Sequence, residues 1–250
     1  MLSASQRLYR KVADELAAAI RGGAYRTGQK LPSERDLAER YGVSRPSIRE
    51  AMIALEIYGL VEIRQGSGIY VVEPRAGTRG AEMEDLDVGA FELLEARIII
   101  EGGAAAVAAT AASEADIARL AGLLDAMERS AAAQSEALDR EFHLELARLT
   151  RNGPLLDAIE TLWDLRTKSK LARMIERRAH GGGRLQRDEE HRAILDALTR
   201  RDPAGARAAM QSHLEKVRDF LLESTETEEI QKLRDQQRQA REALTRRSVY

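Results

Sequence analysis

Cysteine is absent from the 250 residues of this chain, and aromatic residues make up only 4% of them. Without cysteine, the protein forms no disulfide bond and cannot hold a metal ion through thiolate ligands. No uninterrupted apolar run approaches the roughly 20 residues that a helix needs to cross a membrane, and the N-terminal segment lacks the apolar core of a signal peptide. We therefore expect a cytoplasmic protein that makes no membrane contact.

The chain also lacks the excess of positive charge that marks many nucleic-acid-binding proteins, because its formal net charge is −2. Any surface that binds nucleic acid must then be a local patch. The length is sufficient for two modest domains, each with its own core. The low aromatic content and the frequent alanine favour tightly packed helices over an aromatic-lined enzyme pocket, so we expect a mainly α-helical protein.

A helix-turn-helix is predicted near the start of the chain. A first helix over residues 5–21 carries an apolar stripe at helical spacing. Ser33 and Ser44 are placed to cap two further short helices, because a serine hydroxyl accepts a hydrogen bond from the backbone two or three residues on. Gly42 ends the first of these helices, and the second runs to about Tyr58.

A two-stranded hairpin is predicted directly after these helices. Residues 61–64 and 69–72 have the pattern of strands, and the tip between them contains two glycines that suit a tight turn. This order of elements is that of a winged helix-turn-helix, which we assign to residues 1–74. Residues 75–88 are polar, contain glycine and directly follow a proline, so we interpret them as an interdomain linker.

The helix that begins at Ser44 has the side chains that a DNA-reading helix needs. Such a helix enters the major groove with polar side chains near its N-terminus. Arg45 and Arg49 are four residues apart and share one face, and arginine paired with guanine is the commonest specific base contact. Ser44 and Ser47 can bind phosphates, and Arg35 in the preceding helix can reach a phosphate or a base. Each arginine alone could be an ordinary solvated charge, but the combination favours DNA binding.

These segments resemble the DNA-binding domain of the GntR family of bacterial transcription regulators. The motifs LPSERDLA, SRPSIREAMIALEIYGLVE and RQGSGIYV carry the resemblance, which covers residues 6–73. It implies a regulator, and not an enzyme, that binds palindromic double-stranded operator DNA as a homodimer. By position, the DNA contacts of the family would fall on Arg35, Ser44, Arg45, Ser47, Arg49, Gln65 and Gly66.

The second half of the chain shows only helical patterns, and we expect an all-helical antiparallel bundle over residues 89–224. The tail, residues 225–250, is charged and predicted to be helical, either as a solvated helix or as a contribution to a dimer. The predicted helices of the bundle are 90–112, 114–132, 135–151, 154–178, 185–200 and 203–223.

Three of the four histidines and one aspartate form a candidate metal site. Asp139 and His143 are four residues apart, so both project from one face of a helix. His191 and His213 each lie on a separate predicted helix, and a bundle could bring all four side chains together at its centre. Three imidazoles and one carboxylate suit Zn²⁺ or a similar divalent transition ion. Taken singly, each histidine could instead be a surface or capping residue.

The segments around these residues resemble the FCD effector domain of the FadR subfamily of GntR regulators. The patterns D-x-x-F-H, E-H-x-x-I and H-L carry this resemblance, which implies an effector-binding and dimerisation domain with the metal ligands Asp139, His143, His191 and His213. We expect Zn²⁺ first, with Ni²⁺ or Mn²⁺ as alternatives. The segments LEIYGLVEIRQGSGIYV, GAFELLEAR and LWDLR are most similar to hexuronate-operon regulators of the UxuR/ExuR type, which implies a hexuronate or a related sugar acid as effector.

A carboxylate effector needs a cationic partner in the same cavity, and Arg97 is the first candidate. It lies in an otherwise apolar run of the first bundle helix, and its guanidinium offers two parallel donors to a carboxylate. Glu101, four residues on, could instead pair with it. The family frequently uses an arginine on this helix for its effector. Trp163 and Arg166 are further candidates, although a lone tryptophan could equally be part of the core.

The two halves together predict a transcription regulator that represses its operon and releases the operator when the small carboxylate binds. A metal-responsive regulator without an organic effector is the nearest alternative. A metal-dependent hydrolase is a more distant one, because a bound metal can activate water. No further acid–base pair stands at motif spacing, which speaks against the hydrolase.

Overall fold

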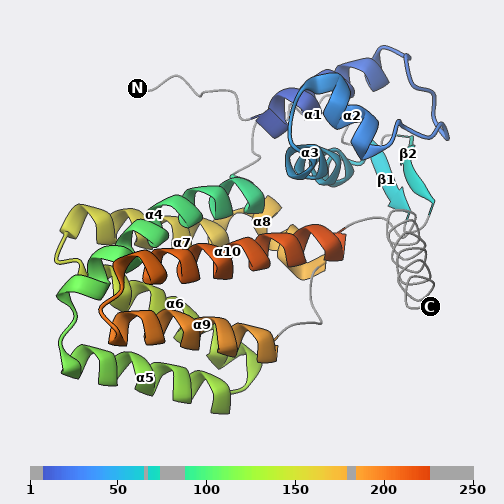
Figure 1. The fold of residues 1–250 in the computed structure, drawn as a ribbon. Coiled ribbons are helices and arrows are strands. Elements are labelled where there is room, and N and C mark those ends of the chain that lie inside the picture. Colours follow the sequence, from blue (N-terminus) through green and yellow to red (C-terminus); the bar gives the residue numbers. More distant parts are fainter. Residues whose placement is uncertain (1–7, 65–66, 74–87, 179–183, 226–250) are drawn as a thin grey trace, which may run out of the picture. The chain divides into compact units, whose positions relative to one another are not determined.

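A computed structural model describes residues 8–64, 67–73, 88–178 and 184–225 of the chain. The chain divides into two compact units, of which the first comprises Met1–Asp87 and Leu222–Tyr250 and the second spans Val88–Leu221. Figure 1 shows the helices of the first unit in blue, its hairpin in cyan, and the helices of the second unit from green to red. Among the described residues, no helix is both long and apolar enough to cross a membrane.

The first unit is a winged helix-turn-helix, as the sequence predicts. Helices α1 and α3 pack against each other, α2 packs on α3, and the hairpin follows α3 directly. The core between the helices consists of aliphatic side chains such as Val12, Leu16 and Ile48, all almost fully buried. The elements are α1 (Leu8–Arg21), α2 (Glu34–Tyr41), α3 (Arg45–Ile57), β1 (Val61–Arg64) and β2 (Gly68–Val71).

Local capping sets the ends of the two helices of the helix-turn-helix. The Ser33 hydroxyl accepts a hydrogen bond of 3.2 Å from the backbone N–H of Asp36 at the start of α2. The Ser44 hydroxyl accepts one of 3.3 Å from the N–H of Ser47 at the start of α3. Gly42 ends α2 with a φ of 63°, a left-handed conformation that glycine adopts without a steric penalty. All three predicted helix boundaries are confirmed.

The hairpin is extended by a short stretch of chain that precedes α2. Strands β1 and β2 are antiparallel, with Val61 opposite Val71 and Arg64 opposite Gly68. Lys30 forms a bridge with Tyr70 on the other side of β2. The sequence did not predict this additional pairing. The hairpin tip at Gln65 and Gly66 lies outside the described residues.

The second unit is the predicted all-helical bundle. Helix α4 is central and packs against α6, α7, α8 and α9, while α5 packs against α6 and α9. Its core contains Leu144, Ile159 and Trp163 together with small alanines. The helices are α4 (Ala90–Ala111), α5 (Glu114–Arg129), α6 (Ala132–Leu149), α7 (Gly153–Lys168), α8 (Lys170–Arg178), α9 (Arg184–Thr199) and α10 (Pro203–Thr225). The predicted linker, except Val88, and the predicted tail helix beyond Thr225 lie outside the described residues.

The single helix predicted over residues 154–178 is wrong, because the structure has two helices that meet at Ser169. Ser169 is extended, with φ −65° and ψ 127°, and ends α7. Its hydroxyl donates a 2.7 Å hydrogen bond to the carbonyl oxygen of Val88 and accepts a 3.1 Å bond from the N–H of Ala172. The break therefore depends on a contact with a distant segment, and the local sequence contains neither proline nor glycine that would announce it.

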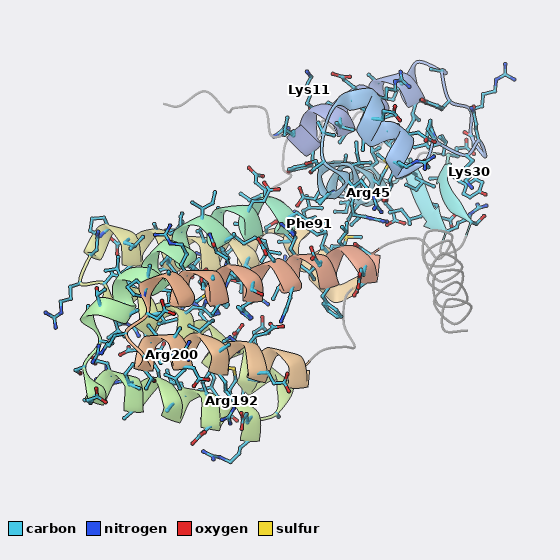
Figure 2. All side chains as sticks on the ribbon, viewed as in Figure 1. Lys11, Lys30, Arg45, Phe91, Arg192 and Arg200 are labelled. Carbon is cyan, nitrogen blue, oxygen red and sulfur yellow. The ribbon has the colours of Figure 1, made fainter. Side chains whose placement is uncertain are left out.

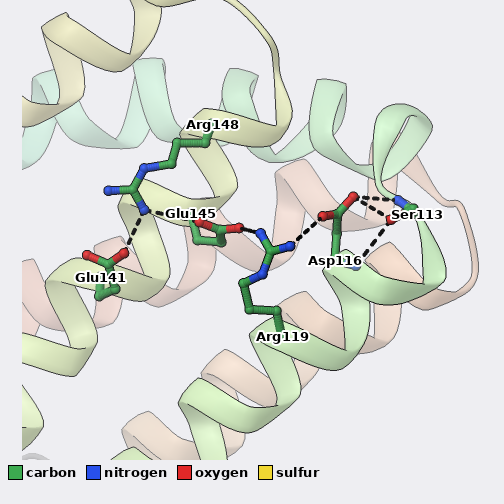
Figure 3. Close-up of polar contacts among 6 residues, drawn as sticks. All are labelled: Ser113, Asp116, Arg119, Glu141, Glu145 and Arg148. Atoms are coloured by element: carbon green, nitrogen blue, oxygen red, sulfur yellow. Dashed lines mark hydrogen bonds and ion pairs between the residues drawn. The ribbon is translucent and has the colours of Figure 1, made fainter.

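Helix α5 begins with a complete capping box. The Ser113 hydroxyl accepts a bond from the N–H of Asp116, and the Asp116 carboxylate accepts one of 2.9 Å from the N–H of Ser113. The same carboxylate lies 3.4 Å from the guanidinium of Arg119, one turn further along α5. Figure 3 shows the Arg119 guanidinium between Asp116 of this cap and Glu145 of α6.

A chain of ion pairs joins α5 to α6, the helix that carries two of the predicted metal ligands. Arg119 pairs with Glu145, which lies two residues after His143 on α6. Arg148 in turn lies 3.1 Å from Glu145 and 2.6 Å from Glu141 (Figure 3). Because Arg119 is more than half exposed, these pairs add little stability one by one. Both arginines share the buried Glu145 carboxylate, and the Arg119–Glu145 pair joins α5 to α6 near the predicted metal ligands.

Candidate functional site

The start of α3 presents a polar surface that suits a phosphate or base contact. The hydroxyls of Ser44 and Ser47 lie 2.8 Å apart in the first turn, where free backbone N–H groups attract anions. Arg45 is partly exposed beside them, and the side chain of Arg35 on α2 is 85% exposed. Figure 2 labels Arg45 on α3. These four predicted DNA-contact residues therefore have side chains that solvent, and so a DNA strand, can reach.

The sequence predicts that Arg45 and Arg49 lie on one face of α3 that contacts DNA, but the Arg49 side chain is not exposed. Its side chain is fully buried, and its guanidinium lies 2.7 Å from the Glu34 carboxylate on α2. The pair joins the two helices of the helix-turn-helix, and burial keeps the guanidinium next to its counter-charge, since separating buried charges is costly. To contact a base, Arg49 would first have to leave Glu34.

Lys30 is a basic residue at the hairpin that the sequence patterns did not single out. Its side chain lies against Gly68, where an added Cβ atom would come within 2.4 Å of Lys30 Cε. Gly68 also has a φ of 117°, a backbone conformation that other residues rarely adopt, whereas the flexible end of the Lys30 side chain could move aside. On the hairpin itself, the Arg64 guanidinium stacks on the Tyr70 ring at 4.6 Å. Figure 2 shows Lys30 beside the hairpin, where its charge adds to that of Arg64.

The bundle brings together the four predicted metal ligands from three helices. Asp139 and His143 come from α6, His191 from α9 and His213 from α10, and their candidate ligand atoms all lie within 4.8 Å of one another. Asp139 Oδ1 is 2.9 Å from His191 Nε2 and 3.7 Å from His143 Nε2. The three imidazoles are buried, and the carboxylate is partly exposed.

Three of the candidate ligand atoms lie close together but form no hydrogen bonds with one another. Asp139 Oδ1, His143 Nε2 and His191 Nε2 are buried, and none has a hydrogen bond of acceptable geometry to any described residue. Buried polar atoms without partners are costly and rare. A cation at their common centre would satisfy all three, and a set of three nitrogens and one carboxylate oxygen matches the ligands that Zn²⁺ takes in proteins. The residues present therefore fit a divalent transition ion.

Two of the histidines are oriented by buried glutamates. His143 Nδ1 hydrogen-bonds to Glu101 Oε2, and His213 Nδ1 lies 2.9 Å from Glu190 Oε2. When Nδ1 donates to a carboxylate, Nε2 keeps its lone pair and faces the metal position. Neither glutamate was among the predicted site residues. The one local signal was the spacing of Glu101 from Arg97, which we interpreted only as a helical ion pair.

The ionisation states of these groups suit metal binding. Burial lowers the pKa of His213 to about 4, so its imidazole is neutral near pH 7. Burial by itself would raise the pKa of Glu101, but Arg97 and His143 outweigh it and lower this pKa to about 2. Burial likewise opposes ionisation of Asp139, but the neighbouring imidazoles hold its pKa well below the usual range. Both carboxyl groups are therefore anionic near neutral pH.

A cavity of about 40 Å³ opens beside these ligands, with room for a few water molecules. Two predicted effector residues, Arg97 and Arg166, line it together with the metal-ligand residues Asp139 and His213. The remainder of the wall is aliphatic and consists of Ala90, Leu93, Leu94, Leu214, Val217 and Leu221.

Trp163, the third predicted effector residue, is 1% exposed and is not one of the described residues that line this cavity. It supports the two arginines instead, because the guanidinium carbons of Arg97 and Arg166 lie 4.0 and 5.1 Å from the centre of its ring. Arg97 also pairs with Glu101 at 2.6 Å. The two predicted roles of Arg97, an ion pair with Glu101 and a place in the cavity wall, are thus compatible.

A winged helix-turn-helix, followed in the same chain by a helical domain with a cavity beside candidate metal ligands, is the architecture of a DNA-binding transcription regulator. Residues 8–71 match the family described as "Bacterial regulatory proteins, gntR family", and residues 92–216 match the FCD domain. The chain belongs to the GntR family of bacterial transcription regulators and carries an FCD domain.

Relatives match the chain over most of its length. The Uxu operon transcriptional regulator of Escherichia coli (strain K12) is 37% identical, over 91% of this chain and 92% of that protein. The Exu regulon transcriptional regulator of the same strain is 35% identical, over 88% and 86%. The HTH-type transcriptional repressor NanR of Cronobacter sakazakii is 34% identical, over 86% and 85%. The protein is therefore a regulator and not an enzyme, and the hydrolase alternative is wrong.

Proposed function

We propose that this regulator is a homodimeric repressor that binds a palindromic operator and releases it when a hexuronate or related sugar acid binds beside a divalent metal ion, with Zn²⁺ as the first candidate. The observation that carries the proposal is the cavity that Arg97 and Arg166 share with Asp139 and His213. It combines two cations with two metal-ligand residues in one small space.

The charges of the site favour an anionic ligand. Glu101 is neutralised by Arg97, and Glu190 lies 3.2 Å from the ammonium of Lys216. A divalent ion held by the Asp139 carboxylate then keeps a net positive charge, which a carboxylate would neutralise. The ion would supply Lewis-acid attraction for the carboxylate oxygens, and the guanidinium of Arg97 or Arg166 would bind them in a bidentate manner.

The lining of the cavity also suits a sugar acid. It combines the two arginines and two metal-ligand residues with aliphatic side chains such as Leu93, Leu94 and Val217. The polar residues would bind the hydroxyl and carboxylate groups of a hexuronate, and the aliphatic residues would contact the C–H groups of its carbon skeleton. A hexuronate is larger than the few water molecules that about 40 Å³ holds, so its binding would require the surrounding side chains or helices to move apart. The similarity to regulators named after the Uxu and Exu operons supports this class of ligand.

In the proposed mechanism, each protomer presents one α3 to one half-site, and two half-sites form the palindrome. Sugar-acid binding changes the conformation of the helical domain and lowers the affinity for the operator. By linkage, operator DNA must weaken sugar-acid binding by the same factor. The relative named as a repressor supports this sign.

The test is a thermal-shift screen of the full-length protein against hexuronates and other small carboxylates, with and without a chelator, followed by gel shifts on operator DNA. We expect one sugar acid to raise the melting temperature only when metal is present and to release the operator. Failure of every sugar acid to change either quantity would refute the proposed effector class.

A metal-responsive regulator without an organic effector is the second candidate, and the convergence of four buried or half-buried ligands favours it as well. The same experiment separates the two. A metal sensor would gain or lose operator binding on chelation alone, and a sugar-acid regulator would require the acid for the change.

A further inference from the structure

Glu101 is a single buried carboxylate held between a cavity residue and a metal ligand. Its Oε1 accepts a 2.6 Å hydrogen bond from Arg97 Nε, and its Oε2 hydrogen-bonds to His143 Nδ1. Glu101 is 2% exposed and Arg97 4% exposed, so solvent screens neither contact. Arg97 lines the cavity, whereas Glu101 and His143 are not among the described residues that line it.

We propose that Glu101 is a positioning residue that sets the affinity of the metal site according to how firmly Arg97 holds it, and that an anion in the cavity acts on the metal through this carboxylate. The inference rests on the proposed metal site and on an anionic effector. It adds a route by which an anion in the cavity changes the affinity of the metal site, and by which a bound metal changes the affinity for the anion.

The direction follows from competition for Arg97. A carboxylate in the cavity draws the guanidinium toward itself and weakens its hold on Glu101. The charge of Glu101 then acts more fully on the Nδ1–H of His143, and a stronger hydrogen bond there makes Nε2 a better donor to a metal ion. Anion and metal should therefore bind with positive cooperativity, and each should raise the affinity of the other by the same factor.

Glu190 provides an internal comparison, because it stands to His213 as Glu101 stands to His143. Its cationic partner is Lys216, which is 49% exposed and is not one of the described residues lining the cavity. An anion in the cavity cannot compete for Lys216. Of the two glutamates that hold a histidine, only Glu101 therefore has a cationic partner among the described residues that line the cavity.

The experiment measures Zn²⁺ affinity of the metal-stripped full-length protein by competition with a chromogenic chelator. It compares the wild type with Glu101→Gln, Arg97→Met, the double variant, and Lys216→Met as the matched control. Circular dichroism and melting curves establish that each variant is folded. Glu101→Gln keeps the size of the side chain and an acceptor for His143 but removes the charge.

We expect the loss of the Glu101 charge and the loss of the Arg97 charge to have opposite effects on Zn²⁺ affinity. Glu101→Gln should weaken Zn²⁺ binding about 10- to 100-fold, the usual effect of losing such an outer partner. Arg97→Met should strengthen it several-fold, and this gain should vanish in the double variant because it passes through Glu101. Lys216→Met should strengthen it clearly less than Arg97→Met does, because Lys216 is half-exposed and its charge is well screened. A saturating concentration of D-glucuronate should tighten Zn²⁺ binding by a larger factor in the wild type and in Lys216→Met than in Glu101→Gln, where only direct coordination of the ion by the acid remains.

Two results would overturn the inference and leave the proposed metal site standing. One is wild-type affinity in a folded Glu101→Gln variant. The other is an equal gain from Arg97→Met with and without Glu101, which would indicate a direct repulsion between guanidinium and metal. A wild-type protein that binds no Zn²⁺ overturns both the inference and the proposed metal site. If D-glucuronate neither releases DNA nor affects Zn²⁺, the proposed effector fails, and the affinities measured without it still decide the role of Glu101.

Discussion

The Arg49 guanidinium lies 2.7 Å from the Glu34 carboxylate, and the two side chains, 0% and 3% exposed, join the helices of the helix-turn-helix. Arg49 therefore contributes first to the relative position of α2 and α3. Any contact with a base would have to compete with this ion pair.

Arg49→Ala is expected to lower the free energy of unfolding by about 3 kcal/mol, because it leaves the buried Glu34 charge without this partner. Urea denaturation of the full-length protein measures the loss. Arg35→Ala is the control and should change stability by less than about 0.5 kcal/mol, since Arg35 is 85% exposed. Equal stability of both variants would show that the Arg49–Glu34 pair does not hold the helices.

Arg45→Ala is expected to weaken operator binding at least about tenfold, while the melting temperature stays unchanged, because a lost base contact costs about 1–3 kcal/mol. Fluorescence anisotropy with labelled operator at fixed salt gives the affinity. Arg200→Ala, an exposed charge in the helical domain, serves as the control. If Arg45→Ala binds the operator as tightly as the control does, the assigned reading surface is wrong.

His143→Ala combined with His191→Ala is expected to abolish stoichiometric metal content. Two of four ligands are then missing, and a divalent transition ion needs most of its protein ligands to compete with water. Elemental analysis of the purified protein measures the content. His180→Ala removes the one histidine outside the candidate site and should leave it unchanged. Retention of one metal ion per chain in the double variant would place the metal elsewhere.

Tryptophan fluorescence should report the arrival of an anion in the cavity. Trp163 is the only tryptophan of the sequence, and its ring carries the Arg97 guanidinium at 4.0 Å. Movement of Arg97 toward a carboxylate changes the surroundings of the ring, so we expect a saturable change in emission on titration with the active sugar acid. Arg97→Met should remove this change. An acid that releases operator DNA without altering the emission would indicate that it binds away from Arg97.

The sequence by itself determined the elements whose boundaries depend on local contacts. Ser33, Gly42 and Ser44 act on backbone groups within a few residues, so the helix-turn-helix could be predicted nearly to the residue. Asp139 and His143 share a helical face because of their spacing alone. Their meeting with His191 and His213 was one possibility of a helical bundle, which the resemblance to a family strengthened, and the packing of α6, α9 and α10 brings the four together.

Tertiary structure alone decided the contacts between residues far apart in the chain. Ser169 breaks a predicted helix through a bond to Val88, 81 residues away, and Glu101 orients His143 across 42 residues. The burial of Arg49 beside Glu34 likewise depends on how α2 packs on α3. Local periodicity states which face of a helix is apolar, but it does not state which helix will cover that face. For this reason the candidate ligands could be predicted, whereas the carboxylates that hold them became visible only in the folded chain.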